Sequence, residues 1–561
     1  MDDSNGRTSN VMIMTFTCST YYIIFICNVE AGYSLQHFSI ICQLLNIFTM
    51  IALFFIPAPF LLALFGILIL LLVVFILKNL FLTIKELIVN DKRPPVVGLM
   101  LNLLIHFNRL FDYQTSAAKR HRTFRFIASS YSEIFTVDPV NVEYILKTNF
   151  SNYGKGGYNC DLMRDLFGHG IFAVDGDKWR HQRKLASYEF STKVLRDFST
   201  AVFRANASKL TLKISDAAAG KQTIDLQDML MKSTLNSIFK VGFGVELNAL
   251  SDSNEFGNQF TKAFDDSNFI VFCRYVDPFW KLKRFLNLGL EASLKKNIKI
   301  IDDFVYELIR YKREQLKSKK LDRGKEDILS RFLMESEKDP VNMSDKYLRD
   351  IILNFIIAGK DSTASTLTWF FYMLCKNPLV QEKVALEVRE ATKVKNSISA
   401  DEFVVITTEE ALNKMHYLHA AITETLRLYP AVPVDGKCPI EDDILPDGFI
   451  VKKDDAVNYM PYAMGRMTYI WGDDAEEFRP ERWLHDGVFQ PESPFKLTAF
   501  QAGPRICLGK EFAYRQMKML AAVLLNFFKF RLEDETREAT YRTMFTLHMD
   551  QGLHLYAYPR L

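Results

Sequence analysis

The chain has 561 residues, of which 49% are hydrophobic and 13% aromatic, including 46 phenylalanines. Its formal net charge of +3 is too balanced for a nucleic-acid-binding protein, which usually carries a strongly basic face or domain. The eight cysteines include no Cys-x-x-Cys pair and no regular close spacing, which argues against a disulfide framework or a zinc site. The composition therefore indicates a large apolar core, reducing surroundings and partners other than nucleic acid.

The front of the chain contains an uncharged apolar run, PFLLALFGILILLLVVFIL, at residues 59–77. At 1.5 Å per residue a helix of this length nearly matches the hydrocarbon core of a bilayer, about 30 Å thick. Basic residues follow the run, so the positive-inside rule predicts that the downstream chain faces the cytosol. We therefore expect a single-pass membrane anchor within residues 47–78, preceded by an extension over residues 1–46 whose role the sequence leaves open.

A basic, proline-rich segment follows the predicted anchor, with DKRPPVVG at residues 91–98. Two adjacent prolines after a basic cluster favour a stiff, non-helical bend. We expect residues 79–110 to form a linker and residues 111–561 to form a single domain, since no repeat or Gly/Ser linker divides them.

One long helix is predicted from Ser344 to Asn377, with Ser344 as its N-cap and the Asn-Pro step as its end. Its middle contains AGKDST, residues 358–363, where glycine costs about 1 kcal/mol relative to alanine and the hydroxyls can bend the helix. Two interpretations remain open. The segment is either a tolerated kink or a groove in which a loosened backbone, an acid and a hydroxyl hold a small polar ligand or relay protons.

A charged pair lies in the amphipathic segment of residues 413–430, where Glu424 and Arg427 are three positions apart. Such a pair is usually a solvated surface contact, but this one stands between apolar residues just before a helix-ending proline. Arg482, in FRPERW at residues 478–483, could complete a Glu-Arg-Arg network with bidentate bonding. We expect that network to fix chain geometry rather than to do chemistry.

A single cysteine, Cys507, stands in FQAGPRICLGK just before a long amphipathic helix. Helix amides and the macrodipole favour a thiolate at this place. A nucleophilic cysteine would need a histidine base, which the sequence does not place nearby, and tetrahedral zinc would need further ligands. One thiolate in an apolar pocket, with Arg505 close by, suits an axial bond to a haem iron.

Five segments together resemble the cytochrome P450 family, over about residue 59 to the C-terminus. The cysteine loop is similar to the family's F-x-x-G-x-R-x-C-x-G motif, and AGKDST is similar to its oxygen-activating A/G-G-x-D-T element. The other three are Glu424-Thr-Leu-Arg427 for E-x-x-R, FRPERW for the P-E-R-F segment with Trp in the Phe position, and Trp179-Arg-His-Gln-Arg183 for W-x-x-x-R. One departure is Ser362, which stands where the family usually has threonine and is followed by Thr363.

The resemblance implies a mainly α fold with small β-sheets, an N-terminal transmembrane helix and a haem b cofactor. It implies that the axial iron ligand is Cys507 and that the haem is held by Trp179, Arg183, Phe500, Arg505, Cys507 and Gly509. Oxygen activation would use Asp361 with Ser362 or Thr363, and the structural network would consist of Glu424, Arg427 and Arg482. Electrons would come from NADPH through a membrane-bound cytochrome P450 reductase.

The implied reaction is monooxygenation of an apolar small molecule by O2 at the endoplasmic reticulum membrane, with the catalytic domain in the cytosol. Residues 432–483 and GPRICLGKEFAYRQMK closely resemble the plant branch that ω-hydroxylates long-chain fatty acids. Three alternatives remain: a monooxygenase of a sterol, terpenoid or foreign compound, a lipid-hydroperoxide isomerase or dehydratase that needs no reductase, and an electron carrier. Dependence of turnover on NADPH and spectral titration with fatty acids would separate these alternatives.

Overall fold

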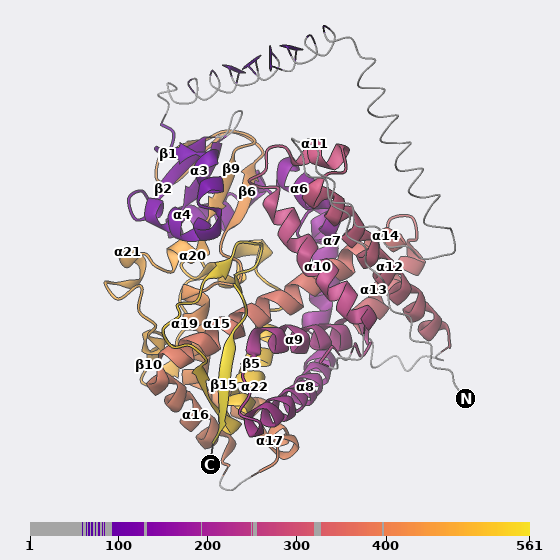
Figure 1. The fold of residues 1–561 in the computed structure, drawn as a ribbon, viewed down its shortest axis with the longest axis vertical. Coiled ribbons are helices and arrows are strands. Elements are labelled where there is room, and N and C mark those ends of the chain that lie inside the picture. The colour runs from indigo at the N-terminus through magenta and orange to yellow at the C-terminus, as the bar shows by residue number, and fades with distance from the viewer. Residues whose placement is uncertain are drawn as a thin grey trace, which may run out of the picture. The chain divides into compact units, whose positions relative to one another are not determined.

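A computed structural model of the chain describes residues 92–127, 132–191, 193–247, 249–250, 255–318, 327–394 and 398–560, with isolated positions of a helix between residues 59 and 84. The chain divides into two units, Met1–Phe81 and Leu82–Leu561, and the fold described below belongs to the second (Figure 1). The predicted extension and, apart from those isolated positions, the predicted anchor lie outside the described residues. Within the described part of the chain, no helix is both long and apolar enough to cross a membrane.

Helices make up most of the second unit. In chain order they are α3 (Met100–Ile105), α4 (Leu110–Ala118), α5 (Pro139–Glu143), α6 (Gly157–Phe167), α7 (Gly176–Ser191), α8 (Lys193–Ala219), α9 (Leu226–Phe243), α10 (Glu255–Cys273), α11 (Trp280–Phe285), α12 (Gly289–Ser318), α13 (Ile328–Lys338), α14 (Asp345–Ile356), α15 (Ser362–Lys376), α16 (Pro378–Thr392), α17 (Ala400–Ile406), α18 (Glu409–Lys414), α19 (His416–Leu428), α20 (Pro461–Met464), α21 (Thr468–Trp471) and α22 (Lys510–Phe527). Short turns of other helical types join them, including the π turn η4 (Ile357–Asp361) and the 3-10 turns η6 (Thr498–Phe500) and η7 (Gly503–Arg505).

The largest sheet has six strands in the order β1-β2-β3-β9-β6-β4. Its strands are β1 (Val96–Leu99), β2 (Thr123–Ile127), β3 (Ser132–Thr136), β4 (Tyr153–Gly154), β6 (Asp435–Pro439) and β9 (Ala456–Tyr459). A second sheet has the order β12-β15-β5, formed by β12 (Phe528–Leu532), β15 (His554–Pro559) and β5 (Ile224–Asp225). Two-stranded pairs are formed by β7 (Asp443–Ile444) with β8 (Ile450–Val451), β10 (Leu484–His485) with β11 (Val488–Phe489), and β13 (Tyr541–Arg542) with β14 (His548–Met549). The predicted mainly α architecture with small sheets is confirmed.

The core surrounds α15, which lies in the middle of the body in Figure 1. Trp369 of this helix is 1% exposed and stacks on Tyr429, with 4.2 Å between the ring centroids. The Trp369 indole also donates a hydrogen bond of 2.8 Å to the carbonyl of Leu547. Because buried aromatic rings contribute large apolar areas, this helix is fixed against neighbours from the C-terminal third of the chain.

Part of the segment predicted as a linker over residues 79–110 belongs to a sheet of the described body. Residues 96–99 form β1, which pairs in parallel with β2, and Arg93 forms a buried ion pair with Asp455. The segment resembles a linker in sequence because its prolines disfavour a helix, but proline also suits the edge of a sheet, and the Arg93 ion pair ties this edge to the body. The described body therefore includes the proline-rich segment from residue 92 onward.

Candidate active site

The loop that contains Cys507 is shaped by close backbone packing. The backbone N–H of Cys507 donates to the carbonyl of Phe500 over 2.8 Å. Gly503 has φ +63°, and a Cβ there would lie 2.0 Å from the carbonyl oxygen of Leu146. Because a side chain is excluded at that position, the turn brings the cysteine to the start of α22 with little freedom.

Cys507 is an exposed residue by its surface area, whereas protein atoms surround its thiol and desolvate it. Burial raises its pKa, while the backbone N–H of Gly509 and the cations of Arg183 and Lys510 act in the opposite direction. The amides and cations at the start of α22 therefore act in the predicted direction, and desolvation acts against them. A positively charged metal centre would reverse that balance, since a coordinating thiol is deprotonated.

Three of the predicted cofactor-binding residues come together beside the cysteine loop. Trp179 and Arg183 lie on α7, and the guanidinium of Arg505 lies 4.5 Å from the Trp179 ring centroid. Arg183 donates a hydrogen bond of 2.6 Å to the carbonyl of Ile506. Arg505 forms an ion pair with Asp175, while its buried Nε has no hydrogen-bond partner among the described residues.

Two further cations that sequence reasoning missed lie near this group. Asp435 forms ion pairs with Lys155 at 2.8 Å and with Lys437 at 3.1 Å. Burial lowers the pKa of Lys437 to about 7 although Asp435 opposes the shift, and the nearby charges of Lys155 and Arg505 lower it further. Lys437 lies within residues 432–483, which carry part of the family resemblance. Its position relative to other residues in that stretch did not predict a role for it.

The predicted long helix is divided into α14, η4 and α15. Ser344 caps it as predicted, accepting a hydrogen bond of 3.5 Å from the backbone of Tyr347. In the π turn the hydroxyl of Ser362 donates to the carbonyl of Ala358 over 2.6 Å, and Thr234 of α9 donates to the freed carbonyl of Lys360 over 3.0 Å. The kink therefore has an identifiable cause in side-chain bonds to the helix backbone.

Gly359 lets α9 approach this kink. A Cβ at residue 359 would lie 2.8 Å from Cδ1 of Ile238, which belongs to α9. Glycine is therefore needed here for a close helix contact and not for an unusual backbone angle.

The three residues predicted to activate oxygen do not share one environment. Ser362 and Ala358 line the main cavity, whereas Asp361 and Thr363 are buried and are not among the residues that line it. Asp361 forms an ion pair of 2.9 Å with Lys360 and accepts a hydrogen bond of 3.0 Å from Asn268 of α10. The side of the helix that faces the cavity therefore carries Ser362 and not Thr363.

A charged network lies under the loops around η5 (Pro480–Trp483). Arg427 bonds Glu424 through two contacts of 2.8 Å, and Nε of Arg482 lies 3.4 Å from the same carboxylate. The carboxylate also accepts a hydrogen bond of 2.9 Å from the indole of Trp483. Arg427 further donates to the carbonyls of Ala475 and Glu477, which ties the helix to a distant segment. The structure thus brings together the three residues expected to form this network.

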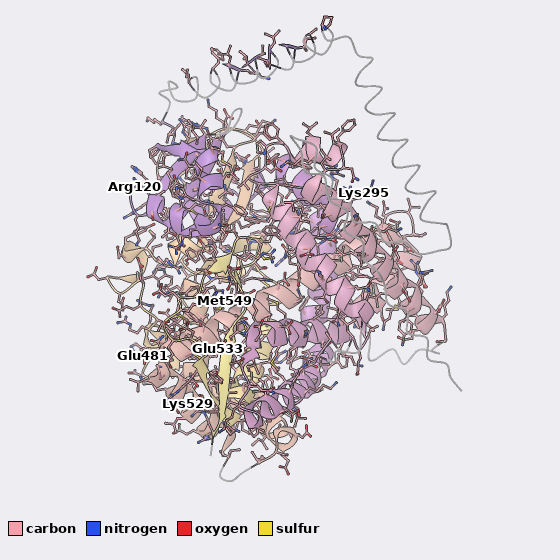
Figure 2. The ribbon with its side chains drawn as sticks, in the orientation of Figure 1. Arg120, Lys295, Glu481, Lys529, Glu533 and Met549 are labelled. Carbon is pink, nitrogen blue, oxygen red and sulfur yellow. The ribbon has the colours of Figure 1, made fainter. Side chains whose placement is uncertain are left out.

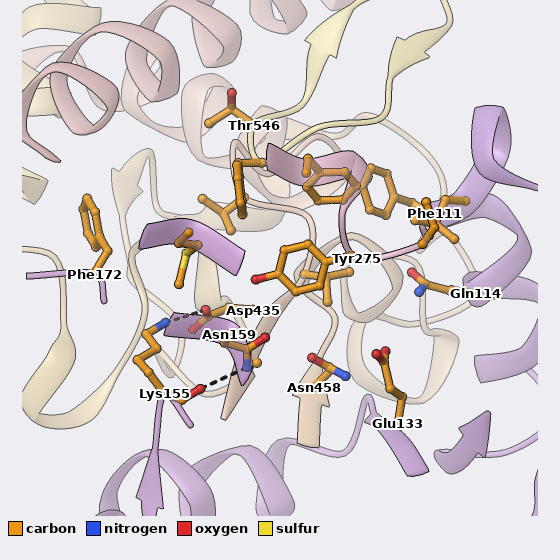
Figure 3. Close-up of a pocket in the computed structure, with 18 of the residues that line it drawn as sticks. Phe111, Gln114, Glu133, Lys155, Asn159, Phe172, Tyr275, Asp435, Asn458 and Thr546 are labelled. Atoms are coloured by element: carbon orange, nitrogen blue, oxygen red, sulfur yellow. Dashed lines mark hydrogen bonds and ion pairs between the residues drawn. The ribbon is translucent and has the colours of Figure 1, made fainter. Parts of the chain in front are cut away.

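The main cavity contains about 1340 Å³ of empty space, including the part open to solvent (Figure 3). Its walls come from α4, β3, α6, the segment after α10, η4, β6 and β9. Most of its lining is aliphatic or aromatic, and Lys155, Asp435 and Gln501 connect it to the cationic group described above. Cys507 is not among the lining residues of this cavity.

Comparisons with known proteins agree with this geometry. The cytochrome P450 family model matches residues 91–555. Cytochrome P450 704C1 of Pinus taeda is 55% identical over 480 residues, covering 83% of this chain and 92% of that protein. Cytochrome P450 704B1 of Arabidopsis thaliana is 47% identical over 492 residues (83% and 94%), and cytochrome P450 86B1 of the same plant is 42% identical over 432 residues (76% and 77%).

The chain belongs to the cytochrome P450 family of haem-thiolate monooxygenases. Its similar relatives include several plant proteins, in agreement with the resemblance of the sequence to a plant branch. Family membership implies a haem iron cofactor.

The charges near the cysteine loop fit a haem. The basic side chains in this region outnumber the carboxylates. The basic residues are Lys155, Arg183, Lys437 and Arg505, and the carboxylates are Asp175 and Asp435. Arg183 and Arg505 keep their positive charges beside the cysteine loop, and the unpaired Nε of Arg505 leaves a donor for a propionate of haem b. Cys507 is a free cysteine, so its sulfur is available to bind the haem iron.

Proposed function

We propose that the enzyme hydroxylates a long-chain fatty acid at or near its terminal carbon, with O2 and with electrons from NADPH through cytochrome P450 reductase. The observation that carries this proposal is the large, mostly apolar cavity that reaches the interrupted helix at Ala358 and Ser362. Such a cavity suits an unbranched chain, because each buried methylene contributes about 0.8 kcal/mol to binding. The resemblance of residues 432–483 to plant ω-hydroxylases supports the same substrate class.

In this mechanism Cys507 would supply the thiolate that binds the haem iron, and Arg183, Arg505 and Lys437 would hold the propionates. The bound haem would supply the oxidising chemistry that inserts one oxygen atom into a C–H bond, while the second atom of O2 leaves as water. The Ser362 hydroxyl would hold a proton at the kink, where its own bond to Ala358 keeps it in place. The apolar walls would exclude water and orient the chain.

We also propose that the enzyme is attached to the endoplasmic reticulum membrane, with its body in the cytosol. The apolar run of residues 59–77 supports an anchor. Large apolar side chains are also exposed on and around α11 and α3, namely Phe279, Leu282, Phe285, Leu286, Leu101 and Ile105. Both helices lie at the same end of the body in Figure 1, so this end suits contact with lipid.

The substrate is tested in microsomes that contain the enzyme and a reductase. We expect NADPH-dependent conversion of fatty acids of graded chain length, with the new hydroxyl located at or next to the last carbon by mass spectrometry. No product at any chain length would remove the fatty-acid proposal and leave the family assignment intact. Turnover of a lipid hydroperoxide without NADPH would instead favour an isomerase or dehydratase.

Replacing Ser362 by alanine is expected to lower the amount of product per NADPH by about tenfold or more, because the cavity loses the hydroxyl that would hold a proton. Substrate affinity should change little, and Ser362→Thr should keep the coupling. Product and NADPH consumption are measured together, with Ser365→Ala as the control, since Ser365 is buried one turn further along α15. Normal coupling in S362A, combined with loss in Thr363→Val, would assign the role to Thr363.

A further inference from the structure

Polar side chains from two strands and one helix meet in one part of the otherwise apolar cavity. Figure 3 shows Glu133, Gln114 and Asn458 near one another, away from Thr546. Side chains of a strand alternate between its faces, so Glu133 and Phe135 of β3 both face the cavity. The parallel register pairs Glu133 with Ala456 and Phe135 with Asn458 of β9, so Asn458 lies two positions further along the sheet than Glu133.

The hydrogen bonds of this polar group are incomplete. Glu133 is 8% exposed, and its carboxyl forms no hydrogen bond or ion pair with any described residue. Burial raises the pKa of Glu133 to about 7, because no nearby cation opposes the desolvation. The amide oxygen of Gln114 is also buried and has no hydrogen-bond partner in the described part of the chain.

The basic side chains near the cavity form ion pairs with another carboxylate. Lys155 and Lys437 are both bonded to Asp435, at 2.8 and 3.1 Å. Buried polar groups without partners cost free energy, and an uncompensated buried charge costs more. A ligand beside Glu133 and Gln114 would meet a carboxyl and an amide oxygen to which no cation is bonded among the described residues, so hydrogen-bond donors on the ligand are favoured there.

We propose that Gln114 and Glu133 bind the polar end of the substrate through a hydrogen-bond donor, either a hydroxyl or a carboxyl that keeps a proton, and not through an anionic carboxylate. This inference rests on the proposed function. It concerns the polar end of the substrate, which lies at the opposite end of the molecule from the carbon that is oxidised. β9 and α4 lie at one end of the body in Figure 1, whereas α15 lies at its middle. A chain with its terminal carbon beside Ser362 thus extends its polar end toward Glu133.

The proposal is tested by calorimetric titration of the haem-loaded enzyme with dodecan-1-ol and its methyl ether, 1-methoxydodecane. The wild-type enzyme should bind the alcohol about tenfold more tightly, because the ether cannot donate to the two acceptors. Glu133→Leu should reduce that preference to about twofold or less, whereas the matched variant Glu133→Gln should keep most of it. Equal binding of the two probes by the wild type, or an unchanged preference in E133L, would overturn the proposal.

A second pair of ligands, dodecanoic acid and its methyl ester, tests whether the hydrogen-bond donor of the substrate is a carboxyl or a hydroxyl. If a protonated acid is bound, titration at pH 8 in two buffers of different ionisation enthalpy should show uptake of close to one proton for the acid and none for the alcohol. If the acid binds more weakly than the alcohol, the donor is a hydroxyl. Tight binding of the acid without proton uptake would mean that the anion is bound, which contradicts the proposal.

Tyr275, Asp435 and Lys155 line the same cavity as Glu133, and Lys437 is bonded to Asp435. Burial lowers the pKa of Lys437 to about 7, so the proton uptake on binding of dodecanoic acid is compared with that on binding of dodecan-1-ol. Equal uptake for the two ligands would come from the protein and contradict binding of a protonated acid, whereas uptake for the acid alone should persist in E133Q, whose amide oxygen still accepts a hydrogen bond. Absence of product from every fatty acid in the microsomal assay would refute the proposed function, whereas unchanged selectivity in E133L, with hydroxylation intact, would refute this inference alone.

Discussion

Replacing Arg427 by alanine is expected to lower the free energy of unfolding by about 3–5 kcal/mol, a large share of the roughly 5–15 kcal/mol of a typical domain. The side chains of Arg427 and Glu424 are both 0% exposed, and they are joined by two bonds of 2.8 Å. Without the guanidinium a buried carboxylate loses its main counter-charge, and the carbonyls of Ala475 and Glu477 lose their donor. Equilibrium denaturation at fixed haem content measures the loss.

The matched control is an exposed ion pair. Lys119 and Glu476 have side chains that are 52% and 60% exposed, so Lys119→Ala should change stability by only about 0–1 kcal/mol. Arg482→Ala should have an intermediate effect, since its contact with Glu424 is longer, at 3.4 Å. If R427A and K119A unfolded at the same denaturant concentration, the network would not carry the stability assigned to it.

Replacing Cys507 by alanine is expected to abolish monooxygenation, leaving only the background of the reductase. Alanine cannot donate an axial ligand, and the thiolate's electron donation to iron is what favours O–O cleavage in this family. The backbone of the loop should persist, because Gly503 and the bond from residue 507 to Phe500 involve only main-chain atoms. Activity, haem content and circular dichroism are measured on the same preparation.

Cys160→Ala is the control for this change, because Cys160 is a second free cysteine, half-buried, and burial raises the pKa of its thiol. Its loss should leave activity near the parent value, since its sulfur has no proposed ligand role. Full activity and haem content in C507A would mean that another residue binds the iron.

Local features of the sequence predicted much of the site. The cysteine loop, the Ser344 cap and the kink of residues 358–363 depend on neighbours within a few positions, where turn and capping chemistry is decided. The Glu424–Arg427 pair is one helix turn apart, and its partner Arg482 was suggested by a recognisable segment. These parts could be predicted because short-range geometry restricts them.

Long-range contacts account for what the sequence did not predict. Asp361 points to Asn268 of α10, 93 positions away, and this contact could not be inferred from the spacing of the motif. The meeting of Lys155 with Asp435 depends on the tertiary arrangement, since 280 positions separate them. Likewise, Glu133 faces the cavity only because the register of β3 and β9 directs alternate side chains there.

The most direct test of the account is the absorption spectrum of the reduced enzyme with carbon monoxide. A thiolate from Cys507 predicts the strongly red-shifted Soret band of a thiolate-ligated haem, and this band should be absent in Cys507→Ala. A Soret band without that shift in the wild-type enzyme would contradict the assignment of Cys507 and the mechanism built on it.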